Sequence, residues 1–178
     1  MAQVHGDILI NRPPEVVFNF VADERNEPRF NPRMVTCSLD SGEPIGEGSR
    51  FKATLRSARR LVPMTVEFTG YERPRLLASH SSLPGAEIDG ELTFAPDGPG
   101  TRMRWSWGVQ AKGLMRLFHP LVSRIGDRQE HRTWQSLKAL LEDTGGVATT
   151  QVRHPDRARR IPGWGPLGPL WGRAKASR

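Results

Sequence analysis

The strongest constraint on the fold is a change in hydrophobic period after Met34. From there to about Gln110, apolar and polar residues alternate in successive segments, which predicts β-strands with one covered face and one face in water. Turn residues such as Gly, Pro, Ser and Asp separate the segments, and short turns join antiparallel neighbours. The predicted strands are Val35–Leu39, Arg50–Arg56, Met64–Tyr71, Leu76–Ser81, Glu87–Ala95 and Thr101–Gln110.

A strand and two short helical pieces precede this region. Alternation over Gln3–Ile10 predicts the strand. A helix is predicted from about Pro13 to Ala22, because Asn11 is a suitable N-cap and proline is favoured in the first turn. Asn26–Asn31 is interpreted as one further helical turn that Pro32 stops.

The segment Leu114–Glu142 is predicted to be the cover of the sheet. Its later half has apolar residues at helical spacing, Pro120 interrupts its start, and Gly145-Gly146 ends it. The order of elements predicts an α+β fold in which a curved antiparallel sheet of about seven strands wraps a long C-terminal helix.

The charge of the chain is concentrated at its C-terminal end. The formal net charge is +7, but Val147–Arg178 contains seven basic residues and one acid. The preceding 146 residues contain 19 basic and 18 acidic residues, so they are close to neutral. We therefore predict a ligand-binding domain over residues 1–145 and a separate basic tail over 146–178, and we expect no specific nucleic-acid partner.

The N-terminal sequence and the cysteine content give expectations about location. No basic segment followed by an apolar stretch opens the chain, and no apolar run approaches the roughly 20 residues of a membrane span. Cys37 is the single cysteine, which excludes an internal disulfide and a cysteine-based zinc cluster. A cytoplasmic protein is expected.

Several segments together resemble a known superfamily. They are residues 8–18 (ILINRPPEVVF), 28–32 (PRFNP), 46–51 (GEGSRF), 66–77 (VEFTGYERPRLL), 100–103 (GTRM) and 137–142 (LKALLE). In content and order they are similar to the superfamily of START domains, polyketide cyclases and the birch-pollen allergen (SRPBCC), over about residues 3 to 142. Phe30 stands where the family usually has Trp.

The resemblance implies a helix-grip fold with a cavity between the sheet and the long helix. Such a cavity would hold an apolar or aromatic molecule, lipid-like or polyketide-like. The resemblance implies no single activity, because members include lipid carriers, hormone receptors and cyclases. No cofactor is expected.

The residues expected to line this cavity are the inward members of the predicted strands and helix. Trp105 and Trp107 share a face with Met103, and aromatic walls suit a flat ligand, although packing against the helix explains them equally well. Gly126 would leave room for a ligand or allow close helix packing. The full set is Phe51, Val66, Phe68, Ile88, Leu92, Met103, Trp105, Trp107, Gly126, Glu130 and Trp134.

Two polar residues are candidates for chemistry. Glu130 lies four residues before Trp134, so the two share a helix face, and a carboxyl group there would act as a general acid or base. The alternative is an ion pair at the rim. His80 would move a proton, or it is a surface histidine. His119 and His131 lack an acidic partner at metal spacing, so no metal site is expected.

The tail has a composition of its own. Basic residues flank two tryptophans in a Gly- and Pro-rich stretch, which is typical of disorder. The alternatives are weak contact with an anionic membrane or with nucleic acid, or a fold back of Trp164 or Trp171 over the cavity mouth. The residues concerned are Arg157, Arg159, Arg160, Trp164 and Trp171.

Three functions therefore compete at the level of sequence. The first is the binding of an apolar small molecule without catalysis, since no catalytic set is assembled. The second is a cyclase or aromatase that acts on a polyketide-like substrate through Glu130 or His80. The third is an interaction mediated by the tail.

Overall fold

The computed structural model describes residues 2–57, 59–112 and 119–146. Within the last range, side chains are described from Gln129 to Asp143. The predictions for Arg157, Arg159, Arg160, Trp164 and Trp171 of the basic tail therefore lie outside the described residues. No helix within the described ranges is long and apolar enough to span a membrane.

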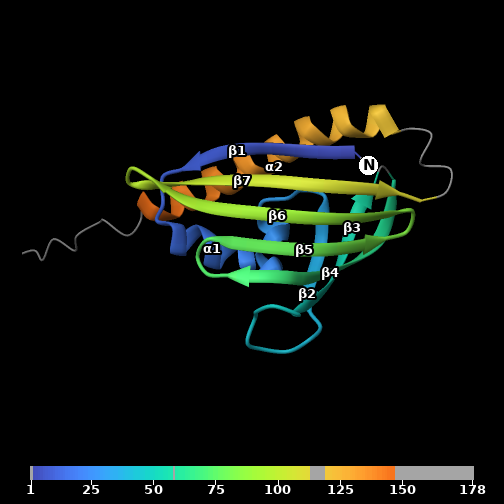
Figure 1. Ribbon diagram of the computed structural model, residues 1–178, viewed down its shortest axis with the longest axis horizontal. Coiled ribbons are helices and arrows are strands. Elements are labelled where there is room, and N and C mark those ends of the chain that lie inside the picture. The colour runs from blue at the N-terminus through green and yellow to red at the C-terminus, as the bar shows by residue number, and fades with distance from the viewer. Residues whose placement is uncertain (1, 58, 113–118, 147–178) are drawn as a thin grey trace, which may run out of the picture.

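A seven-stranded antiparallel sheet and a long C-terminal helix form the fold, as the sequence predicts (Figure 1). The elements in chain order are β1 (Ala2–Ile10), α1 (Pro14–Ala22), the 3-10 helix η1 (Glu24–Arg29), β2 (Met34–Leu39), β3 (Arg50–Ser57), β4 (Arg60–Glu72), β5 (Leu76–Leu83), β6 (Ala86–Asp97), β7 (Gly100–Ala111) and α2 (His119–Gly146).

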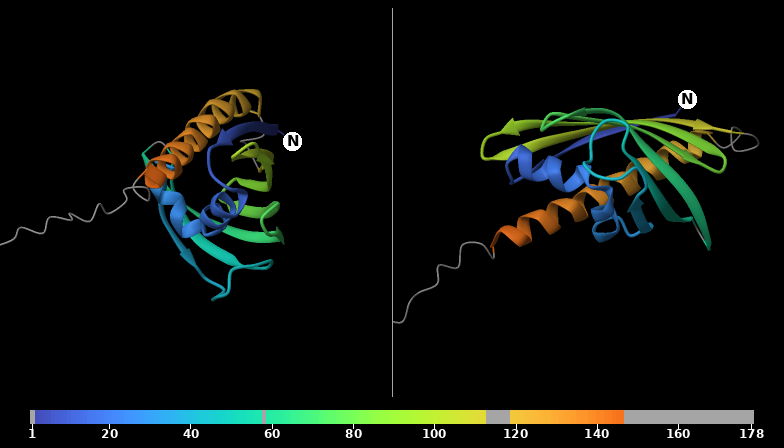
Figure 2. Two further views of the ribbon diagram at one scale, coloured as in Figure 1. Left: turned by 90° about the vertical axis from the view of Figure 1, so that its left-hand side faces the viewer. Right: turned by 90° about the horizontal axis from the view of Figure 1, so that it is seen from below.

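The sheet is a meander with one rearrangement. Strands β2 to β7 are neighbours in chain order, and β1 pairs with β7, so the first strand closes the row at the edge that α2 covers. Seen end-on, the sheet curves around α1 and α2 (Figure 2). Irregularities in pairing occur between Met34 and Thr36 and between Phe68 and Gly70, and bulges of this kind increase local bending.

The strands predicted from alternation are confirmed and extend a few residues further. The largest difference is β4, which begins at Arg60 rather than Met64, because Arg60–Pro63 pair with β3 in a long hairpin. The pairing of β4 with β5 starts only at Thr65, so Pro63 lies where one side of the strand is a free edge. Strand edges tolerate a missing donor better than a central ladder does.

The start of α1 differs from the prediction. Pro13, not Asn11, is the N-cap, and no side chain caps the helix. The backbone N–H of Asn11 instead donates to Glu142 Oε1 at 2.7 Å, and Arg12 Nε donates to the Leu141 carbonyl at 2.8 Å. The link between β1 and α1 is therefore fastened to the end of α2.

The turn before β2 also begins earlier than predicted. η1 spans Glu24–Arg29, and Asp23 caps it by accepting a hydrogen bond from the Arg25 N–H at 3.2 Å. Asn31, predicted as part of the helical turn, lies beyond it. This shift matters because it places two glutamates on η1 itself.

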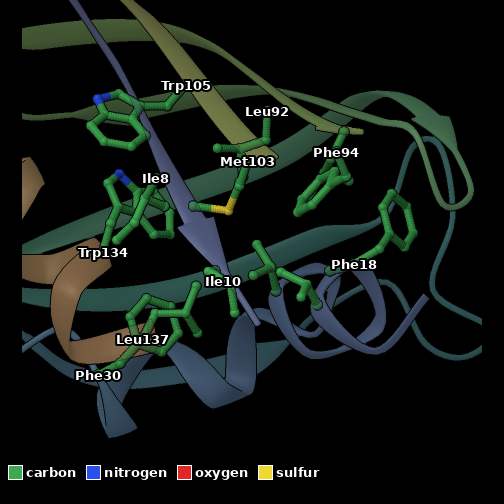
Figure 3. Packing of buried hydrophobic residues seen from close by; sticks show 14 of the residues in the cluster. Ile8, Ile10, Phe18, Phe30, Leu92, Phe94, Met103, Trp105, Trp134 and Leu137 are labelled. Carbon is green, nitrogen blue, oxygen red and sulfur yellow. The ribbon is translucent and has the colours of Figure 1, made fainter. Parts of the chain in front are cut away.

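The core fills the concave side of the sheet beneath α1 and the second half of α2 (Figure 3). Ile10, Phe18, Met103 and Leu137 are fully buried. Phe18 makes edge-to-face contacts with Phe94 at 5.3 Å and with Tyr71 at 5.2 Å between ring centroids, a favourable aromatic geometry. This aromatic group is the packing centre of the α1 side.

Truncation of Phe18 tests this assignment. Phe18 is 0% exposed, whereas Val16 on the same helix is 45% exposed. We expect Phe18→Ala to lower the free energy of unfolding by about 3–5 kcal/mol through loss of burial and an unfilled cavity. The control Val16→Ala should change it by less than about 0.5 kcal/mol. Urea denaturation measures both, and equal effects would contradict the described packing.

Candidate functional site

A cavity of about 270 Å³ lies between the concave face of the sheet, η1 and α2. Its walls are mostly apolar and come from the inward positions of the strands. Polar side chains enter from η1, from the residues after it and from α2. Typical apolar wall residues are Met64, Val66, Leu77, Ile88, Leu92 and Val109.

Six of the residues predicted to line a cavity do so. They come from three strands and one helix, so the predicted inward faces of β4, β6, β7 and α2 all border the same cavity. Strand β5 also lines it. The six are Val66, Ile88, Leu92, Trp107, Glu130 and Trp134. Their contact with a ligand stays a prediction.

Four of the predicted lining residues belong to the core instead: Phe51, Phe68, Met103 and Trp105. Each points inward as predicted, but at most 4% of each residue is exposed because neighbours cover it. Phe51 and Phe68 pack together at 5.3 Å between ring centroids. Trp105 instead packs against Trp134 of α2, at 5.9 Å between ring centroids. Alternation predicts the face of a strand on which a residue lies, but not whether neighbouring side chains cover it there.

Gly126 lies in α2, in the part for which only the backbone is described. Its predicted role at the cavity therefore stays a prediction.

His80 does not reach the cavity. Its neighbours Ser79 and Ser81 line the cavity, so strand alternation turns His80 to the outer face, where 43% of its side chain is exposed. Nδ1 lies 2.7 Å from Asp89 Oδ1 and Nε2 lies 3.3 Å from Glu87 Oε2. The hydrogen bond to Asp89 raises the pKa of His80. The prediction of His80 as a catalytic group at the cavity is wrong.

Glu130 is the polar group that the sequence placed well. Its carboxylate accepts a hydrogen bond from Trp107 Nε1 at 3.1 Å, so it faces the sheet rather than an arginine at the rim. Burial raises the pKa of Glu130, and the hydrogen bond from Trp107 opposes that shift. A carboxyl group with a raised pKa is suited to proton transfer.

Two glutamates of η1 are cavity residues that the sequence reasoning missed. Glu24 and Glu27 both line the cavity, and Glu27 accepts a hydrogen bond from Asn31 Nδ2 at 2.7 Å. Burial raises the pKa of Glu24 well above 4.5, and the charge of Glu27 adds to the effect. The available signal was their spacing of three residues, which places two side chains on one side of a helical turn.

Glycines opposite the tryptophans shape the cavity wall. Gly90 is the cross-strand partner of Trp107, and Gly6 is the partner of Trp105. A Cβ atom at either glycine would overlap the indole ring of its partner. Each indole ring therefore lies flat over the backbone of its partner glycine. Because the Trp107 ring lies over Gly90, it projects less far into the cavity.

Replacement of Gly90 tests this wall. We expect Gly90→Ala to displace the Trp107 ring and to lower the free energy of unfolding by about 1–3 kcal/mol, as overpacking does. Gly46→Ala is the matched control, because a Cβ there meets nothing within 4 Å, and it should stay within about 0.5 kcal/mol. Denaturation curves that coincide for the two variants would contradict this account.

The shifted pKa of Glu130 predicts a pH dependence of stability. The pKa of Glu130 is raised on folding from its ordinary value of 4.5. Such a group contributes its full stabilisation of the folded state when the pH is below 4.5, and this contribution is lost as the pH rises through the folded-state pKa. The stability of the parent relative to Glu130→Gln should therefore fall as pH rises from about 4.5 towards neutrality.

Urea denaturation across this range measures that difference. The control is Glu67→Gln, which removes an exposed carboxylate that pairs with Arg50 at 3.6 Å on the outer face. A stability difference for Glu130→Gln that does not change with pH would show that the group is not perturbed by folding.

Solved structures with the same fold are numerous. A START superfamily protein from Mycobacterium smegmatis superposes with a TM-score of 0.71 at 14% identity, over 81% of this chain and 99% of the other. The Zhui aromatase/cyclase from Streptomyces sp. R1128 gives 0.68 at 14% identity, over 83% and 97%. A protein from Thermus thermophilus gives 0.66 at 16% identity, over 83% and 99%. These likenesses show the helix-grip fold.

The family is shown by the sequence itself. No curated protein matches the chain. The family model described as polyketide cyclase / dehydrase and lipid transport matches residues 1–142, which include every described strand and most of α2. The chain belongs to this polyketide cyclase/dehydrase and lipid transport family of the SRPBCC superfamily.

Proposed function

We propose that this protein binds an apolar or aromatic small molecule, lipid-like or polyketide-like, in the cavity between the sheet and α2. The observation that carries the proposal is the cavity itself: apolar walls on the sheet side and a few polar groups gathered at η1 and α2. Ligand sites in proteins combine apolar walls with a small number of orienting polar groups.

The dimensions of the cavity fit this role. Its volume of about 270 Å³ lies just below the range of roughly 300–1,000 Å³ typical of ligand pockets, which favours a small ligand. Burial of apolar ligand surface contributes about 25 cal/mol per Å², so a small ring system gains useful affinity from the walls alone. The polar end then determines the orientation of the ligand.

The position of Glu130 supports catalysis as a second candidate function. Its carboxyl group lies inside an apolar cavity, is held by Trp107 and has a raised pKa. A group of this kind removes or delivers a proton at a substrate carbon or oxygen in cyclisation and dehydration reactions. The family to which the chain belongs, polyketide cyclase / dehydrase and lipid transport, includes both binding and chemistry in its description.

Occupancy of the cavity is the first test. Protein purified under native conditions and extracted with organic solvent should release a recurring apolar species that mass spectrometry detects. Ser81→Phe, which places a ring inside the cavity, should abolish this species, because Ser81 lines the wall. Ser38→Phe, at an exposed position of β2, should retain it. An extract that is the same for both variants would contradict binding in the cavity.

A substrate identified in this way separates the two functions. If the protein is an enzyme, Glu130→Gln should lower turnover by about 100-fold or more while binding persists, since general acid–base groups contribute factors of this size. Unchanged turnover in Glu130→Gln would remove Glu130 from the mechanism. Absence of turnover in the parent protein would favour simple binding.

A further inference from the structure

The hairpin of β3 and β4 carries an unbalanced positive charge. Residues 48–66 contain five basic residues and no acidic one, whereas acidic residues outnumber basic ones in the rest of residues 1–146. Two of the five basic residues form ion pairs with carboxylates of neighbouring segments. The other three, Arg56, Arg59 and Arg60, are exposed, and none of them forms an ion pair with a described residue. Their positive charge is therefore uncompensated within the described part of the chain.

The end of this hairpin extends beyond the neighbouring strand. β4 begins at Arg60, but its pairing with β5 starts only at Thr65, so residues 60–64 pair with β3 alone. The right-hand view of Figure 2 shows this hairpin reaching away from the rest of the sheet. We call Arg56, Ser57 and Arg59–Leu61 the hairpin tip. Because it projects, the tip is able to touch a flat surface that the remainder of the sheet does not reach.

Leu61 adds an apolar group to the tip. Its exposed fraction of 63% is the highest among the large hydrophobic residues that the structure describes, ahead of Val16 at 45%. Leu61 is the cross-strand partner of Arg56 and follows Arg60 in the chain, and it does not belong to the hydrophobic core. Packing within the domain therefore does not account for a leucine at this position.

Charge, projection and an exposed leucine together fit the surface of an anionic bilayer. Basic side chains are attracted to anionic head groups, and an apolar side chain among them enters the boundary with the acyl chains. A protein partner fits less well, because a stable interface buries about 800 Å² on each side and the tip offers one large apolar residue. The described residues of the tip include no aromatic ring on which a nucleic-acid base would stack.

We propose that the hairpin tip is a contact surface for anionic membranes, with its three arginines against the lipid head groups and Leu61 inserted between them. This surface lies outside the cavity, so the inference does not rest on the proposed binding function. Leu55 and Met64, which flank the tip on β3 and β4, line the cavity. Contact through the tip would therefore bring one part of the cavity wall close to the bilayer.

Vesicle sedimentation of the full chain tests the inference. Vesicles of phosphatidylcholine are compared with vesicles that also contain phosphatidylserine. We expect binding to the anionic vesicles, which weakens as the salt concentration rises, and little binding to the neutral ones. Arg59→Gln/Arg60→Gln should lower the affinity for anionic vesicles about tenfold, and Arg59→Lys/Arg60→Lys should retain it because the charge is kept.

The matched control removes the same charge elsewhere. Arg73 and Arg104 are exposed and have no ion pair with a described residue, and they lie away from the tip, in the turn after β4 and in β7. Arg73→Gln/Arg104→Gln should keep the affinity for anionic vesicles within about twofold, since charges far from the contact are screened. Residues 147–178 are the same in every variant, so their contribution to binding cancels in the comparison.

Leu61 separates a bilayer from other polyanions. We expect Leu61→Ser to lower the affinity for anionic vesicles about fivefold, because a buried leucine side chain is lost from the contact. Its affinity for a single-stranded oligonucleotide should equal that of the parent protein, since that contact depends on charge alone. Unfolding midpoints equal to that of the parent would show that the variants of the tip are folded.

Three results would overturn the inference. Failure of the parent protein to bind anionic vesicles would exclude a membrane contact. Equal affinities of the glutamine variant of the tip and its control would attribute vesicle binding to net charge or to another part of the chain. Unchanged vesicle binding in Leu61→Ser would reduce the tip to a basic patch for polyanions in general.

Discussion

The seating of α2 in the curved sheet is the contact on which the rest of the structure depends. Trp134, Leu137 and Leu141 form its buried face. Hydrogen bonds fix its position, since Lys138 Nζ donates to the Leu9 carbonyl at 2.8 Å and Glu142 accepts from Asn11. These bonds join residues about 130 positions apart, so they hold the two ends of the domain against each other.

The packing of α2 against the sheet divides the concave face into two regions, a filled core and a cavity. Beneath α1, aromatic side chains around Phe18 fill the space completely. Between η1 and the first described side chains of α2, the same face stays unfilled and becomes the cavity. A single sheet surface thus supplies both the stability of the domain and its candidate binding site, and Trp134 belongs to both regions because it contacts core and cavity alike.

The sequence predicts the strands well because alternation and turn residues are local signals. It also places Glu130 correctly, since its spacing from Trp134 defines a helix face. It does not distinguish Phe68 from Val66, both inward on β4, because only tertiary packing decides which is covered. His80 fails because Leu76 and Leu77 are both apolar, so alternation alone does not say which face of β5 is inward; Leu77 is the buried one, which turns His80 outward. Glu24 and Glu27 become cavity residues only through the packing of η1 opposite α2, which the sequence does not predict.

The pairing of Gly90 with Trp107 affects how the shape of this cavity can change between related sequences. Gly90 and Trp107 form one part of the cavity wall on β6 and β7, whereas the acidic lining residues Glu24, Glu27 and Glu130 come from η1 and α2. Substitutions at separated positions have nearly additive effects, with the Trp107–Glu130 hydrogen bond as the point of coupling. The size and the charge of the cavity can therefore change independently, and one added methyl group at position 90 would alter the size while leaving η1 untouched.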